Sequence, residues 1–118
     1  MIAEFIIEEI ESTVVVRVQL DRATLSKAAL FRDTIEELIQ SGKLNIIIDC
    51  RNIAFMDSTF LGAIVVSLKK VNSLKGKFCL VFADKSSLVL SMLETTRMLK
   101  IIKIFFSIED ALKDFDLP

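Results

Sequence analysis

The feature that most constrains this chain is an alternation of two kinds of segment along most of its length. Short apolar runs rich in branched residues alternate with longer stretches in which apolar residues recur at helical spacing. Strands that alternate with helices favour crossover units and a largely parallel sheet. We therefore expect strands over 2–10, 13–20, 44–50, 78–82 and 101–106, and helices over 25–40, from 58 to before 76, over 86–97 and just after Ser107.

The first two runs differ from the others because only Glu11 and Ser12 separate them. So short a connection predicts an antiparallel hairpin, which we place at one edge of the sheet. Residues 44–50 are apolar on both faces, as in a central strand that is covered from both sides. With 118 residues and 53% hydrophobic content, the expected fold is a single α/β domain over 1–118, with a mixed β-sheet and crossover helices.

Composition excludes several classes of function. Fifteen basic and sixteen acidic residues leave a formal net charge of −1, so no global field attracts nucleic acid. The chain has no histidine, which removes Ser-His-Asp and Cys-His nucleophile systems and His-based zinc sites. No basic region followed by an apolar stretch opens the sequence, and no apolar run reaches membrane-spanning length. We expect a cytoplasmic protein without a membrane partner.

Cys50 and Cys79 lie within or at the ends of strand-like runs. Their spacing matches neither a CxxC motif nor any metal-ligand pattern. We therefore expect two buried free thiols, no metal site and no cofactor.

Asp57 and Ser58 lie where segment 51–56, expected to be a plain connection, passes into the second long helix. The unpaired N–H groups of a first helical turn, together with the helix dipole, suit a phosphate. Phosphorylation of Ser58 would add about −1.5 to −2 charges beside the Asp57 carboxylate. Serine and aspartate are also common helix caps, and the residue types alone favour that interpretation.

Polar residues follow several of the expected strands. In open α/β sheets, functional groups gather beyond the carboxyl ends of the strands, where loops and helix N-termini meet. Asp21, Asp49, Asp57 and Ser58 all follow strands in this way. If the strands share one orientation, these four side chains approach one rim of the sheet.

A resemblance to the STAS domain of bacterial anti-sigma factor antagonists is carried by two segments, Asn45-Ile46-Ile47-Ile48-Asp49 and Met56-Asp57-Ser58-Thr59-Phe60-Leu61-Gly62. A third segment, Val18-Gln19-Leu20-Asp21, resembles the family's Gly-Glu-Leu-Asp turn, and residues 93–112 resemble its carboxyl end. The resemblance covers essentially the whole chain and implies the STAS fold.

What the resemblance implies is a binding switch without catalytic activity. The unphosphorylated domain would hold an anti-sigma factor that is also a serine kinase, freeing a sigma factor for transcription. Phosphorylation of the motif serine would end that hold, and a serine phosphatase would reset the switch. Carried over by position, Ser58 is the phosphoacceptor and Asp57 its acidic neighbour. The implied partner-binding residues are Asp21, Met56, Asp57, Ser58, Thr59, Phe60 and Leu61.

The chain departs from the family pattern at Phe60, where many members have glycine, and at Arg97, where glycine is common after the third helix. An aromatic residue at position 60 is either a core side chain, the commoner role, or an exposed contact anchor. Thr59 is a second hydroxyl at nearly the same place as Ser58. The motif favours Ser58 as the acceptor.

Other functions remain open to different degrees. Asp49 ends a central strand as the acceptor of a phospho-aspartate receiver does, but the paired acidic residues and the lysine of a receiver's magnesium site are missing. A small enzyme that uses Cys50 or Asp49 with Ser58 would lack a suitable base and a glycine-rich phosphate loop. The strongest alternative is the same fold serving as an interaction subunit of a transporter or of another signalling complex.

Overall fold

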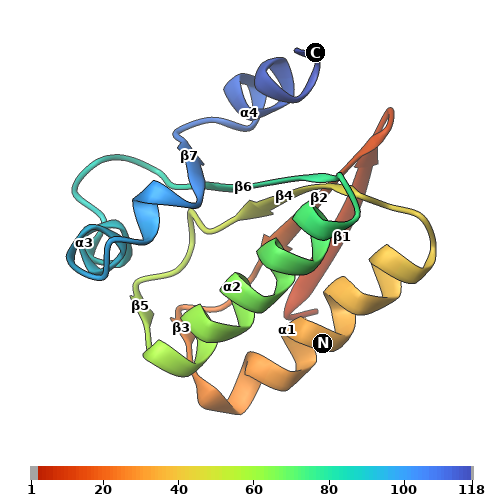
Figure 1. Ribbon diagram of the computed structural model, residues 1–118. Coiled ribbons are helices and arrows are strands. Elements are labelled where there is room, and N and C mark those ends of the chain that lie inside the picture. The colour runs from red at the N-terminus through yellow and green to blue at the C-terminus, as the bar shows by residue number, and fades with distance from the viewer. Residues whose placement is uncertain (1–2, 118) are drawn as a thin grey trace.

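A five-stranded β-sheet forms the centre of the fold, with the strand order β1-β2-β4-β6-β7 (Figure 1). The computed structural model describes residues 3–117. Along the chain the elements are β1 (Phe5–Ile10), β2 (Thr13–Val18), β3 (Arg22–Ala23), α1 (Leu25–Gln40), β4 (Asn45–Asp49), β5 (Phe55–Met56), α2 (Ser58–Ser73), β6 (Lys77–Val81), α3 (Leu88–Thr95), the 3₁₀ turn η1 (Met98–Lys100), β7 (Lys103–Phe105) and α4 (Ile108–Phe115).

Strands β1 and β2 form the expected antiparallel hairpin at one edge of the sheet. The pairings of β2 with β4, β4 with β6, and β6 with β7 are all parallel. Parallel neighbours need long crossovers, and the segments that contain α1, α2 and α3 supply them. The predicted α/β fold with a mixed sheet and crossover helices is confirmed, and so is the central position of the strand predicted at 44–50.

The helices cover the two faces of the sheet unequally. Helices α1, α2 and α3 pack on one face and α4 packs on the other (Figure 1). Successive side chains of a strand point to opposite faces. Ile46 and Ile48 therefore join the larger core with Phe31, whereas Ile47 joins the smaller core with Ala111. The central strand is apolar on both faces because it contributes to two cores.

Gly76 permits the close passage from α2 into β6. A Cβ atom at this position would lie 2.2 Å from the backbone oxygen of Leu44 and 2.8 Å from the Cγ1 atom of Val71. The same Leu44 oxygen accepts the N–H of Lys77 at 2.8 Å. Any side chain at position 76 would push the backbone away from this hydrogen bond.

The helix starts largely follow the sequence predictions. Helix α1 has the predicted bounds, and α2 begins at Ser58. Helix α4 begins directly after Ser107, whose hydroxyl accepts the N–H of Asp110 at 3.0 Å, as an N-cap does. None of the helices within residues 3–117 has the length and the apolar character that a membrane crossing requires.

The third helix is shorter than the predicted span 86–97. It begins at Leu88 because Ser87 is its N-cap and accepts the N–H of Leu90 at 3.3 Å. It ends at Thr95, and two residues later Arg97 adopts a left-handed backbone conformation with a φ of 61°. That conformation cannot continue a right-handed helix, so the chain turns into η1 instead.

Strands β3 and β5 were not predicted, and segment 51–56 is not a plain connection. Phe55 and Met56 pair in parallel with Arg22 and Ala23 in a separate two-stranded sheet. A strand of two residues is too short to carry a periodic pattern. The small sheet lies beside the first turns of α1 and α2 (Figure 1).

Candidate functional site

The small β3–β5 sheet places the chain from Asp21 to Ala23 alongside the segment that leads into α2. The carbonyl oxygen of Asp21 accepts the N–H of Ala54 at 2.8 Å, and the N–H of Asp57 donates to the carbonyl oxygen of Ala23 at 3.1 Å. The Asp21 and Ser58 side chains are exposed, and that of Asp57 is half-buried. Asp57 and Ser58 are neighbours at the end of this small sheet, and Asp21 lies at its beginning, beside Ala54. We call the surface of residues 21 and 57–59 the rim.

Asp57 caps two helices at once. Its Oδ1 atom accepts the N–H of Phe60 in α2 at 2.9 Å, and its Oδ2 atom accepts the N–H of Leu25 in α1 at 2.8 Å. The N–H of Phe60 chiefly, with those of Leu25 and Thr59, holds the pKa of the Asp57 carboxyl below its ordinary value of 3.8, against the opposing effect of partial burial. Asp57 is therefore ionised at neutral pH and is held in place by backbone groups.

Ser58 and Thr59 are the first two residues of α2, and both side chains are exposed. Their hydroxyls lie at the positive end of the helix dipole, where negative charge is favoured. A group added to either hydroxyl would face solvent beside the Asp57 carboxylate. The rim therefore offers a hydroxyl that an enzyme can reach, in surroundings where an added charge has large effects.

Three of the expected partner-binding residues are core residues instead. Met56, Phe60 and Leu61 are exposed by 3%, 0% and 7%. The ring centroid of Phe60 lies 5.0 Å from that of Phe31, with the planes tilted by 46°. Of the two interpretations left open for Phe60, the core position is confirmed. The three side chains are not available to a partner in this conformation, and they support the exposed residues from below.

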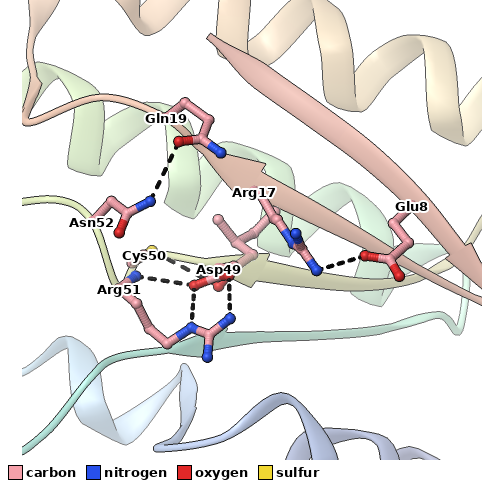
Figure 2. A network of polar contacts seen from close by, with 8 residues as sticks. Glu8, Arg17, Gln19, Asp49, Cys50, Arg51 and Asn52 are labelled. Atoms are coloured by element: carbon pink, nitrogen blue, oxygen red, sulfur yellow. Dashed lines mark hydrogen bonds and ion pairs between the residues drawn. The ribbon is translucent and has the colours of Figure 1, made fainter. Parts of the chain in front are cut away.

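Asp49 does not join the rim, so that part of the prediction is wrong. Strand alternation turns Asp49 away from the face that Ile48 and Cys50 share with α1 and α2. Its carboxylate accepts two guanidinium N–H groups of Arg51, each at 2.9 Å, and the Arg51 backbone N–H at 3.0 Å (Figure 2). Asp49 is only 6% exposed, and Arg51 engages both of its oxygens. This arrangement disfavours a phosphoaccepting aspartate.

The polar side chains around Asp49 form further contacts, although the buried Nε atom of Arg17 has no hydrogen-bond partner among the described residues. Arg17 donates to Glu8 at 2.8 Å across the β1–β2 hairpin, and Asn52 donates to Gln19 at 3.4 Å (Figure 2). These contacts connect β1, β2 and the segment after β4. Their geometry supports a structural role.

Exposed apolar side chains flank the rim, and none of them is among the residues predicted to bind a partner. Leu25, Phe55 and Leu88 are exposed by 68%, 43% and 77%. Leu25 and Thr59 border a hollow of about 280 Å³ between α1 and α2. Phe55 and Leu88 border a hollow of about 210 Å³ between β5 and α3. Large apolar side chains exposed beside a polar centre are typical of protein-binding surfaces.

No sequence signal marks these three residues as surface. Leu25 and Leu88 are apolar residues at the starts of helices, where the 3.6-residue pattern assigns them to a buried stripe. Phe55 lies in the segment interpreted as a connection. Only the packing of α1, β5 and α3 in the folded protein shows that they face solvent.

Cys50 and Cys79 are buried free thiols, as predicted. Burial is the main cause that raises the pKa of the Cys79 thiol to about 12, and it also raises the pKa of Cys50. Among residues 3–117, no group of three or more cysteine and carboxylate side chains is placed to hold a metal ion. This part of the chain therefore offers neither a reactive thiol nor a set of metal ligands.

A family model described as the STAS domain matches residues 4–111. The chain belongs to the STAS domain family. The family resemblance drawn from the sequence is thereby confirmed. No curated protein matches the chain at a significant level.

Solved structures with the same fold include anti-sigma factor antagonists. A candidate anti-sigma factor antagonist from Thermotoga maritima is 24% identical, with 96% of this chain and 95% of that chain covered and a TM-score of 0.85. The Bacillus cell fate determinant SpoIIAA in its phosphorylated form is 20% identical, with 93% and 97% covered and a TM-score of 0.71. SpoIIAA, an anti-sigma factor antagonist, is also known in its unphosphorylated form. At these identities the likeness shows the fold.

The same fold also occurs in a transporter. The murine anion transporter Slc26a9 is 16% identical, and the match covers 91% of this STAS domain but only 18% of the transporter, with a TM-score of 0.69. STAS folds therefore occur both as separate small proteins and within a much longer chain.

Proposed function

We propose that this STAS domain is an anti-sigma factor antagonist controlled by phosphorylation of Ser58. In the unmodified state it binds an anti-sigma factor that is also a serine kinase, and this binding frees a sigma factor for transcription. Phosphorylation of Ser58 releases the partner, and a serine phosphatase restores binding. The protein itself needs no catalytic residue or cofactor for this role, and it acts in the cytoplasm.

The observation that carries the proposal is the position of Ser58. Its hydroxyl is exposed on the first residue of α2, directly beside the ionised Asp57. A phosphate there adds about −1.5 to −2 charges beside the Asp57 carboxylate. A partner that packs on the unmodified rim could pack on the phosphorylated rim only by desolvating this added charge. Each 1.4 kcal/mol of lost binding energy corresponds to about a tenfold weaker affinity.

The proposed contact surface is wider than the residues expected from the sequence. It comprises the exposed rim residues Asp21, Ser58 and Thr59 and the flanking apolar residues Leu25, Phe55 and Leu88. The apolar side chains supply the contact area and the hydroxyls the control point. Met56, Phe60 and Leu61 act from below by fixing the position of the first turn of α2.

A binding titration tests the proposal, with the anti-sigma kinase encoded in the same genome as the partner. Native protein and Ser58→Ala should bind alike in the absence of ATP, and Ser58→Asp should bind at least about tenfold more weakly. Ser12→Asp is the matched control, because it adds the same charge in the exposed β1–β2 turn, at the other end of the hairpin from the rim. Equal affinity of Ser58→Asp and native protein would contradict the proposal.

Mapping the phosphate by mass spectrometry after incubation with the kinase and ATP separates the two hydroxyls. The proposal expects modification at Ser58, and Ser58→Ala should then stay unmodified. Phosphate found only on Thr59 would refute the assignment.

A second candidate function is an interaction subunit of a transporter or of another signalling complex. The likeness to the STAS region of the murine Slc26a9 transporter favours it. Affinity capture with the native protein and with Ser58→Asp distinguishes the two functions. Recovery of an ATP-binding kinase by the native form alone supports the first, and recovery of transporter components by both forms supports the second.

A further inference from the structure

Two helices that are far apart in the sequence share one carboxylate at their N-termini. Asp57 bonds to the N–H of Leu25, which is 32 positions earlier in the chain, at 2.8 Å and to the N–H of Phe60 at 2.9 Å. Residues 25–28 and 58–61, the first turns of α1 and α2, contain no acidic residue of their own. Asp57 is therefore the carboxylate that faces the positive ends of both helix dipoles.

The N-cap residue of α1 does not replace this bond. Among the described residues, the side chain of Thr24 caps no N–H group of α1, and its hydroxyl lies 3.3 Å from that of Ser26. An N-cap side chain reaches the second or third N–H of a helix, so the first N–H depends on a group from elsewhere in the fold. For Leu25 that group is Asp57.

We propose that Asp57 is a latch between the starts of α1 and α2, and that a phosphate on Ser58 acts by opening this latch at Leu25. The first part depends only on the contacts of the free protein. The second part rests on the proposed phosphorylation of Ser58. Asp57 is then a positioning residue of the rim, and it acts through Leu25 and Ser58.

The chemistry of the first turn explains why the phosphate would open the latch. A phosphate on Ser58 is a dianion on the residue next to Asp57, and the N–H groups of Thr59 and Phe60 that favour the carboxylate also favour the phosphate. Repulsion and competition for these donors both move Asp57 away from its present position. We expect the bond to Leu25 to be lost with it, because Leu25 belongs to the other helix.

The consequence extends to the partner surface. Leu25 is 68% exposed and borders the hollow beside Thr59, so it belongs to the proposed contact surface. Opening the latch frees the first turn of α1 and changes the position of this apolar side chain. One modification therefore adds charge to the rim and also alters the adjacent apolar part.

Asp57→Ser separates the latch from the cap. Serine is as good an N-cap as aspartate, but it has a single oxygen on a shorter side chain, so it can cap Phe60 without reaching Leu25. Amide hydrogen exchange of the full-length chain, followed by NMR, should show about tenfold faster exchange at Leu25 and unchanged exchange at Phe60. Asp33→Ser, an equal charge loss at an exposed site of α1, is the control and should leave both rates as in the native protein.

Incorporation of phosphoserine at position 58 tests the second part. In the native background it should accelerate exchange at Leu25 about tenfold, and in Asp57→Ser it should cause no further change, because the latch is already open. Native exchange at Leu25 in either Asp57→Ser or the phosphorylated native protein would overturn the proposal. Faster exchange at Leu25 in a phosphorylated protein that still binds its kinase would support the latch and refute the proposed function. Native exchange at Leu25 in a phosphorylated protein that no longer binds its kinase would refute the latch and support the proposed function.

Discussion

Replacing Phe60 with alanine should destabilise the fold rather than remove a contact with a partner. Phe60 is completely buried, and its ring packs 5.0 Å from that of Phe31 under the first turn of α2. Truncating a buried phenylalanine to alanine costs about 3–5 kcal/mol, through lost burial and the cavity left behind. We expect Phe60→Ala to lower the free energy of unfolding by that amount.

The predicted loss should leave a folded protein on which binding can be measured. A 118-residue domain has a total stability of about 6–18 kcal/mol at typical values per residue. At a urea m-value of about 2 kcal/mol/M, the loss lowers the unfolding midpoint by about 1.5–2.5 M. Urea titration followed by circular dichroism measures the shift, and a Phe31→Ala/Phe60→Ala cycle should give a coupling of about 0.5–1.5 kcal/mol.

Phe55→Ala is the matched control, because it makes the same truncation on the exposed side of the site. Phe55 is 43% exposed, and the guanidinium of Arg22 lies 4.4 Å from its ring centroid. We expect it to cost less than about 1 kcal/mol of stability and to weaken binding of the partner. If Phe60→Ala instead left stability within about 1 kcal/mol of native and abolished binding, Phe60 would be a contact anchor and the reasoning would be refuted.

Three further predictions concern glycine, pH and thiol reactivity. Gly62→Ala should stabilise the protein by about 0.5–1 kcal/mol, because a Cβ atom at position 62 meets no heavy atom of the described chain within 4 Å. Gly76→Ala should destabilise it by about 1–3 kcal/mol, because a Cβ atom there clashes with Leu44 and Val71. Equal effects of the two substitutions in urea titration would contradict this prediction. Folding lowers the pKa of Asp57 below 3.8, so the stabilisation that its carboxylate gives is complete above pH 3.8 and is lost as the pH falls through the folded-state pKa. The unfolding free energies of native protein and Asp57→Asn should therefore converge in acid. A difference between them that stays constant with pH would refute this prediction. Cys50 and Cys79 should react with a thiol reagent at about pH 8 only as fast as the protein unfolds, and rapid labelling of folded protein would count against their burial.

The sequence was sufficient for the sheet, the crossover helices and the position of Ser58 because these depend on strong local patterns. The stripe of α1 runs over 16 residues, and the structure reproduces its bounds. The start of α2 follows from a polar pair between an apolar run and a helical stripe. The same signals placed Asp57 and Ser58 at the start of a helix, where the structure has them.

The position of Asp49 could not be predicted because its strand is apolar on both faces. Strand alternation fixes that Asp49 and Ile48 point in opposite directions. It does not say which face α1 and α2 will cover when Ile46, Ile47 and Ile48 are all equally apolar. The larger helices pack on the side of Ile46 and Ile48, and Asp49 is left on the other side with Arg51.

The shared cap at Asp57 shows a different limit of local pattern. A pattern within one segment assigns each cap to its own helix, and in this way Asp57 is correctly interpreted as the N-cap of α2. Its second oxygen meets Leu25 only because β3 and β5 pair, and those two-residue strands give no periodic signal. A substitution at Asp57 therefore reports on α1 as well as on α2, and a measured loss of binding there does not by itself identify a direct contact with the partner.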